Sequence, residues 1–181
     1  VAGEITTAAS RVLATRVAPA DAPVVTRLRE AGAILIGKTN LHEFALGTTS
    51  EDSAFGAVHN PLDPTRSAGG SCGGSAAAVA CGMGLASIGT DTGGSIRIPA
   101  AACGVVGLKP TTGGVPGGGV IPHSTSLDLV GPITTWVADA ALLWAVLAAR
   151  QTPDLSARKG SLSLVRLRGY FDDPVEPAVR T

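Results

Sequence analysis

The sequence predicts an α/β fold in which short buried strands alternate with helices. Asp21–Ala31 has a helical apolar pattern, and the continuously apolar run Ala33–Gly37 that follows is typical of a strand buried on both faces. Two further apolar runs, Leu85–Gly89 and Gly104–Leu108, and an apolar helix at Val137–Ala149 continue this layering. Hydrophobic residues make up 45% of the 181 residues, so the chain has enough apolar material for a core.

The first predicted helix has recognisable ends. Asp21 is a candidate N-cap, Pro23 lies in the first turn, and Gly32 follows the last helical residue. A second helix of small residues is expected at Ser75–Cys81. Two further elements are expected near the end of the chain: a strand at Leu162–Leu167 and the beginning of a helix at Glu176–Thr181.

Composition excludes several classes of function. The formal net charge is +0 and the chain has no basic stripe, so a direct nucleic-acid partner is not expected. No apolar run reaches the ~18 residues that a membrane span needs. Cys72, Cys81 and Cys103 have no CxxC spacing, and an odd number of cysteines indicates free thiols in a reducing, cytoplasmic compartment. No cluster of residues has metal-ligand spacing, so we expect no metal.

Two serine-containing glycine clusters are the candidate chemical features. They are AGGSCGGS at Ala68–Ser75 and GTDTGGSIRIP at Gly89–Pro99. Glycine at this density permits positive φ and close approach of the backbone. Successive N–H groups in such turns can converge on an anion. Taken alone, each cluster is also compatible with an ordinary tight turn.

These clusters and their flanks resemble the amidase-signature family. The matching segments are GGSCGGSAAAVA from Gly69, GTDTGGSIRIPAAACGVVGLKPT from Gly89, and AGAILIGKTNLHEFALG upstream. The resemblance extends from Ile5 to Ala148. It implies a mixed central sheet covered by helices on both faces, with residues 1–181 forming a partial domain that is truncated at both ends.

The family cleaves or transfers amide bonds with a Ser–cis-Ser–Lys triad. By resemblance, Ser95 is the nucleophile that forms an acyl-enzyme, and Ser71 is the relay, preceded by a cis Gly70–Ser71 peptide. The two hydroxyls are then expected within hydrogen-bond reach of each other. The implied oxyanion hole consists of the backbone amides of Thr92, Gly93, Gly94 and Ser95. This agrees with the chemistry, because a serine hydroxyl needs an activating base and an oxyanion needs pre-oriented donors.

The third member of the triad is not found in the sequence. In the family the catalytic lysine precedes a stretch similar to Val1–Ser10, so it is expected a few residues before Val1. By resemblance Lys38 is not the base, and we interpret it as a lysine at the end of a strand; Lys109, which precedes Pro110, is interpreted as structural. The isolated chain is therefore expected to be inactive.

Three residues near the serines have weaker expectations. Arg97 either binds an acidic group of the substrate or is a structural arginine. Asp91 is expected to orient the turn before Ser95 through backbone hydrogen bonds. Cys72 stands where the family usually has a second serine, and we interpret it as a small substitution rather than a thiol nucleophile.

The resemblance implies a small-molecule amide substrate and no cofactor, and it leaves a homo-oligomer open. The substrate is not specified. The segment IPHSTSLD is more similar to general amidases, and the alternative is the A-type subunit of a glutamine-dependent amidotransferase.

Two other classes of protein share single features with this chain. Gly69–Gly73 satisfies G-x-S-x-G, and Ser71, Asp91 and His123 follow in the chain order of an α/β-hydrolase triad. That motif requires a buried strand before it, whereas the preceding run NPLDPTRSA is polar and rich in proline. A phosphate-binding module is disfavoured because GxxxxGK[ST] is absent.

Overall fold

The computed structural model describes residues 1–156, 160, 163 and 165. The described part contains two 3-10 turns, four helices and three strands. In chain order they are η1 (Arg11–Leu13), α1 (Pro23–Glu30), η2 (Glu43–Ala45), α2 (Gly73–Ala80), β1 (Ala86–Asp91), α3 (Arg97–Ala102), β2 (Val106–Gly107), β3 (Leu129–Thr134) and α4 (Val137–Ala148). The predicted elements at Leu162–Leu167 and Glu176–Thr181 lie outside the described residues, apart from single positions.

The three strands form an antiparallel sheet with β3 in the centre, between β1 and β2. Both pairings are antiparallel, whereas the mixed sheet was expected for the complete domain, of which these three strands form a part. Gly89 of β1 pairs with Gly131 of β3, and Gly107 of β2 pairs with Ile133 of β3. The sheet therefore places glycines of all three strands close together.

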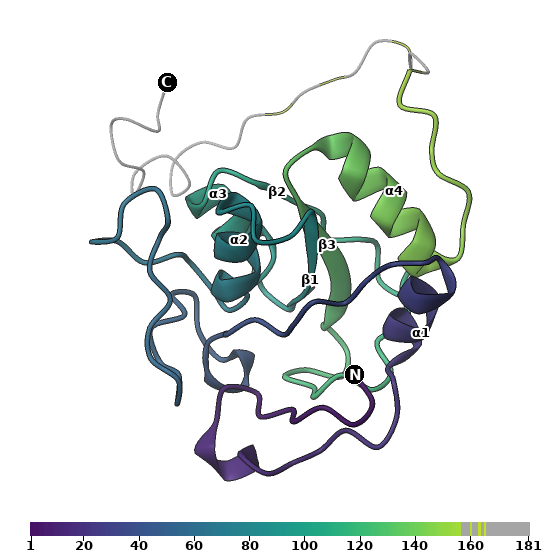
Figure 1. The fold of residues 1–181 in the computed structure, drawn as a ribbon. Helices are drawn as coiled ribbons and strands as arrows, with labels where there is room; N and C mark the ends of the chain where they lie inside the picture. Colours follow the sequence, from purple (N-terminus) through teal and green to yellow (C-terminus); the bar gives the residue numbers. More distant parts are fainter. Residues whose placement is uncertain (157–159, 161–162, 164, 166–181) are drawn as a thin grey trace.

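Helices cover both faces of this sheet, as expected (Figure 1). Helices α2 and α3 lie on one face, where Ile133 of β3 joins a buried cluster with Cys72, Val79 and Ile96. Helices α1 and α4 lie on the other, where Val130 of β3 packs in a second cluster. Neighbouring side chains of a strand alternate between faces, so β3 contributes to both cores.

The predicted helices at the two ends of the described fold are confirmed with small shifts. Helix α1 begins at Pro23 and is followed by Gly32 with φ +82°. Asp21 is not its N-cap: Ala22 occupies that position, and the Asp21 carboxylate accepts hydrogen bonds from the Ala2 amide and the Arg29 side chain. Helix α4 ends one residue earlier than predicted. No helix among the described residues is long and apolar enough to cross a membrane.

The predicted buried strand at Ala33–Gly37 is wrong. The segment is irregular, and the side chains of Ile34 and Ile36 are 87% and 75% exposed. No strand in the described part of the chain pairs with it. An apolar run indicates a preference for burial, and it forms a buried strand only where neighbouring strands and helices cover it.

The central strand β3 was missed. Its residues are all buried, but Pro132 lacks the N–H that a central strand normally contributes, which argues against a strand at the level of sequence. The Pro132 carbonyl accepts a hydrogen bond from the Leu108 amide at 3.1 Å. The strands predicted at Leu85–Gly89 and Gly104–Leu108 are found as β1 and β2, the latter reduced to two residues.

Candidate active site

Ser71 lies at the N-terminal side of α2, and the Gly70–Ser71 peptide is cis, as expected. The preceding Gly69 has φ +74°, and a Cβ there would come within 2.9 Å of the Cα of Pro99. Ser71 is 0% exposed. Within the described residues its hydroxyl oxygen is a buried side-chain atom without a hydrogen-bond partner. Since such atoms are rarely left unpaired, this hydroxyl is a candidate for chemistry.

Ser95 lies in the turn between β1 and α3 and is 8% exposed. Its segment is joined to that of Ser71 by a hydrogen bond of 3.1 Å from the Cys72 amide to the Ser95 carbonyl. The expected hydrogen bond between the two hydroxyls is not formed in this structure, because the Ser71 hydroxyl has no partner among the described residues. The structure thus brings together the two chain segments, and it leaves the side chain of Ser71 unpaired.

Ile96 anchors the turn that carries Ser95. It is 0% exposed and packs on the sheet at positions where each strand has a glycine. A Cβ would lie 3.0 Å from Ile96 Cγ1 at Gly89, 2.9 Å from Ile96 Cγ2 at Gly107 and 3.1 Å from Ile96 Cδ1 at Gly131. These contacts are tighter than ordinary van der Waals packing, so only glycine leaves room for Ile96. The sheet therefore fixes the residue next to Ser95.

Asp91 organises the same turn from its buried position. Its carboxylate accepts hydrogen bonds from the amides of Gly94 (2.8 Å), Ile96 (3.2 Å) and Arg97 (3.4 Å). Burial acts to raise the pKa of Asp91, but hydrogen bonds and charge from Arg97 and the Ile96 amide outweigh it, so the pKa lies below its ordinary value. The expectation that Asp91 orients the turn is confirmed.

The backbone amides of the turn differ in their availability. The Gly94 amide donates to Asp91, so it is occupied in this structure. Among the described residues no acceptor contacts the amides of Thr92, Gly93 and Ser95. Gly93 is exposed, and a Cβ there would meet no atom within 4 Å. The open side of the turn can therefore receive a ligand atom.

Arg97 forms an ion pair with Asp91. Its Nε and Nη2 atoms each lie 3.0 Å from a different carboxylate oxygen. These bonds raise the pKa of the guanidinium further. They use two of its three nitrogens, which favours the structural interpretation over contact with substrate, although the side chain is 52% exposed.

Cys72 is buried beside Ser71 and is engaged by Thr90. Its thiol donates to the Thr90 carbonyl at 3.3 Å and accepts from the Thr90 amide at 3.2 Å. Burial raises the pKa of this thiol, which disfavours the thiolate needed for nucleophilic attack. The thiol contacts thus agree with a packing role for Cys72.

The two described lysines contact other groups. Lys38 Nζ donates to the Ile5 carbonyl at 2.5 Å and to the Thr6 hydroxyl at 2.7 Å. Burial lowers its pKa. Lys109 Nζ donates to the Pro110 carbonyl at 3.0 Å. Neither ammonium therefore makes a hydrogen bond to Ser71 or Ser95.

The α/β-hydrolase alternative lacks its geometry. The segment before Ser71 is irregular, with one isolated bridge between His59 and Ser67, so no strand leads into the serine. Asp91 contacts Arg97 and the turn amides, while the His123 amide donates to Asp128.

The described residues contain no group of three or more His, Cys, Asp and Glu that could hold a metal.

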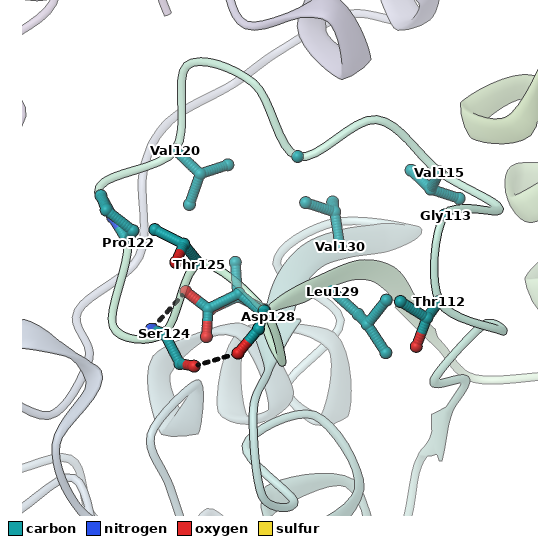
Figure 2. Close-up of a pocket in the computed structure, with 13 residues that line it drawn as sticks. Thr112, Gly113, Val115, Val120, Pro122, Ser124, Thr125, Asp128, Leu129 and Val130 are labelled. Carbon is teal, nitrogen blue, oxygen red and sulfur yellow. Dashed lines mark hydrogen bonds between the residues drawn. The ribbon is translucent and has the colours of Figure 1, made fainter.

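A cavity of about 380 Å³ lies between the 112–126 segment and the start of β3 (Figure 2). Hydroxyl side chains of the 124–126 loop and apolar side chains of β3 line it. Asp128 in its wall accepts hydrogen bonds from the amides of His123 and Ser124 and from the Thr92 hydroxyl. Burial acts to raise the pKa of Asp128, but these bonds, that from Thr92 first, lower it below its ordinary value. Asp128 therefore joins the loop at residues 123–126, called the cavity loop below, to the turn before Ser95.

A second cavity, of about 520 Å³, is lined by residues 5–9 and 38–41, together with Phe44, Phe55 and the 119–121 segment. Thr90 and Val120 border both cavities. Ser71 and Ser95 line neither of them. Asp128 lies in the segment IPHSTSLD, but reasoning from the sequence gave it no role, because its contact with Thr92 joins residues far apart in the chain.

Comparisons with known proteins agree with this geometry and identify the class. The chain matches the family model described as Amidase over residues 1–170, and it belongs to the Amidase family. It is 55% identical over 152 residues to the A subunit of glutamyl-tRNA(Gln) amidotransferase from Syntrophobacter fumaroxidans, covering 84% of this chain and 31% of that protein. It is 57% identical over 174 residues to the protein of the same name from Prochlorococcus marinus, covering 96% and 35%.

Solved structures show the same relationship. The chain superposes on the A subunit of glutamyl-tRNA(Gln) amidotransferase from Thermotoga maritima with a TM-score of 0.80 and 51% identity, covering 81% of this chain and 32% of that one. It also superposes on the peptide amidase of Stenotrophomonas maltophilia with a TM-score of 0.76 and 44% identity, covering 87% and 34%. The chain thus spans about a third of the length of these relatives.

Proposed function

We propose that this chain carries the nucleophile and the oxyanion-binding turn of an amide-cleaving enzyme. Ser95 attacks the substrate carbonyl and forms an acyl-enzyme, and Ser71 relays the proton that Ser95 releases. The observation that carries the proposal is the buried, unpaired hydroxyl of Ser71 on a segment hydrogen-bonded to the Ser95 carbonyl. A buried hydroxyl without a partner costs stability, which is typical of a group kept for chemistry.

The oxyanion of the tetrahedral intermediate would be stabilised by the amides of Thr92, Gly93 and Ser95. They have no acceptor among the described residues, while the Gly94 amide is held by Asp91. We therefore propose this narrower set of donors in place of all four amides. One such donor is typically worth about 2.7–4 kcal/mol of transition-state stabilisation.

The base that accepts the proton from Ser71 is proposed to be the lysine that the resemblance places before Val1. Lys38 and Lys109 donate to backbone carbonyls and, for Lys38, to Thr6. A lysine acting as base must be neutral, and burial beside a polar relay lowers its pKa in that direction. Residues 1–181 alone are then expected not to turn over amides.

We propose glutamine as the substrate, as for the A-type component of an amidotransferase. The two curated relatives described above, 55% and 57% identical, carry the name of the glutamyl-tRNA(Gln) amidotransferase. This favours the amidotransferase alternative over the general amidase that the IPHSTSLD segment suggested. The implied partners are the other components of such a complex and a tRNA-linked acceptor, and the implied location is the cytoplasm. The likeness to a peptide amidase keeps simple amide hydrolysis as the second candidate.

A chimera tests the proposal. Residues 1–150 would replace the corresponding segment of the Thermotoga maritima protein, which supplies the remaining two thirds of the domain. Release of ammonia from glutamine, abolished by Ser95→Ala, supports the amidotransferase function. Turnover of peptide amides without glutamine turnover would assign the second candidate. Activity that survives Ser95→Ala in the chimera, or amide turnover by residues 1–181 alone, would contradict the proposed mechanism.

A further inference from the structure

The carbonyl oxygen of Ser71 accepts two hydrogen bonds from one distant segment. The His42 amide donates to it at 3.0 Å, and the Ser50 hydroxyl donates to it at 3.0 Å. Both donors precede Ser71 by more than twenty residues in the chain, so tertiary structure alone brings them together. Two donors on one carbonyl fix the orientation of the peptide group between Ser71 and Cys72.

Ser50 is buried, and its hydroxyl both donates and accepts a hydrogen bond. It is 0% exposed, and its φ of +57° is a left-handed backbone conformation that residues other than glycine rarely adopt. Its hydroxyl also accepts a hydrogen bond from the Gly73 amide at 3.0 Å. A Cβ at Gly70 would lie 2.9 Å from this oxygen, and a Cβ at Gly73 would lie 2.5 Å from it. The glycines on either side of Ser71 therefore leave space for the Ser50 hydroxyl.

His42 completes this arrangement. Its Nδ1 accepts a hydrogen bond from the Ser50 amide at 3.2 Å, which assigns the proton of the neutral ring to Nε2. Nε2 lies 3.5 Å from the Asp52 carboxylate. The ring packs against Gly47, where a Cβ would lie 2.2 Å from Cε1. His42 thus holds Ser50 through its ring and Ser71 through its amide.

We propose that Ser50 and His42 are positioning residues for Ser71. They fix the Ser71 carbonyl, and through it the direction of the unpaired Ser71 hydroxyl, without contacting substrate themselves. The kinetic part of this inference rests on the proposed function, whereas the hydrogen-bond network does not. Ser50 is the stronger test of the two, because its hydroxyl joins the Ser71 carbonyl to the Gly73 amide.

The network is tested first in the 181-residue chain by amide hydrogen exchange. Ser50→Ala removes the acceptor of the Gly73 amide, and we expect exchange at Gly73 to accelerate by about tenfold. Ser53→Ala is the matched control, because the Ser53 hydroxyl in the same loop bonds Asn40 and Phe55 instead. Acceleration at Gly73 only in Ser50→Ala supports the network. Unchanged exchange at Gly73, or equal acceleration in both variants, would overturn it.

The positioning role is tested by turnover in the chimera. Ser50→Ala and Ser50→Gly both remove the hydroxyl, and only glycine also relieves the cost of the left-handed φ, which serine and alanine share. If the hydroxyl positions Ser71, both variants lower kcat by about tenfold with little change in KM, since the contact lies outside the substrate site. A defect that is large in Ser50→Ala and small in Ser50→Gly would show that loss of the hydroxyl is not its cause and would overturn the role. An inactive unsubstituted chimera with accelerated Gly73 exchange in Ser50→Ala would contradict the proposed function and support the network.

Discussion

The backbone amide of Cys72 donates a hydrogen bond of 3.1 Å to the carbonyl oxygen of Ser95. This bond joins the two serine-containing glycine clusters, together with the two hydrogen bonds between the Cys72 thiol and the Thr90 backbone. It uses backbone groups only, so the hydroxyls of Ser71 and Ser95 stay available. Ser50 and His42 donate hydrogen bonds to the Ser71 carbonyl in the first cluster. Asp91 accepts a hydrogen bond from the Gly94 amide in the second cluster, and Ile96 packs against the sheet there.

The close packing of Ile96 predicts a specific sensitivity to added methyl groups. Gly89→Ala would place a Cβ 3.0 Å from both Cys72 Sγ and Ile96 Cγ1, so we expect it to destabilise the fold by about 1–3 kcal/mol. Gly37→Ala is the control, because a Cβ there meets no atom within 4 Å. Chemical denaturation measures both. Equal stability of the two variants would show that Ile96 is not confined by Gly89.

The contact between Thr92 and Asp128 predicts that the cavity loop and the turn at Thr92–Ser95 act together on the rate of turnover. Thr92→Val keeps the shape of the side chain and removes the hydroxyl that donates to Asp128. In the chimera we expect Thr92→Val and Asp128→Ala each to lower kcat, by about tenfold, and the double variant to be no slower than the slower single variant. Thr92→Ser should restore most of the rate. Additive losses in the double variant would contradict the coupling.

The lowered pKa of Asp91 predicts how stability changes with pH. A carboxyl whose folded pKa lies below its unfolded value of about 3.9 adds stability above that value, and this stability is lost as the pH falls through the folded pKa. Asp91→Asn removes this contribution, so it should destabilise the chain at neutral pH and converge with the native chain in strong acid. Urea unfolding across this range measures the difference. A constant difference at every pH would mean that the Asp91 charge does not contribute.

The sequence was informative where local patterns decide the structure. The helices at α1, α2 and α4 follow from their apolar and small residues and, for α1, from Pro23 in the first turn, and the turns around Ser71 and Ser95 follow from their glycines. The sequence was misleading where packing against other segments of the chain decides whether a residue is buried. Ile34 and Ile36 are apolar and exposed, while Pro132 is buried in the central strand. Burial of a strand depends on its neighbours, which a single run of residues does not record.

The site could be predicted only in part for a similar reason. The family motifs indicated Ser71, Ser95 and the cis peptide between Gly70 and Ser71, because each motif is continuous in the chain. Ser50 lies outside the quoted family segments, and Asp128 lies in IPHSTSLD, a segment to which the sequence assigned no contact. Their contacts arise from tertiary structure, and only the fold reveals them.

The central claim is that Ser95 is the nucleophile, and covalent labelling tests it most directly. The chimera would be treated with a fluorophosphonate, which reacts with activated serine hydroxyls, and the modified peptide would be located by mass spectrometry. We expect the label on Ser95, with none on the Ser95→Ala variant and slower labelling on Ser71→Ala, which loses the relay. Labelling of Ser71 or Cys72 in the native sequence would contradict the account.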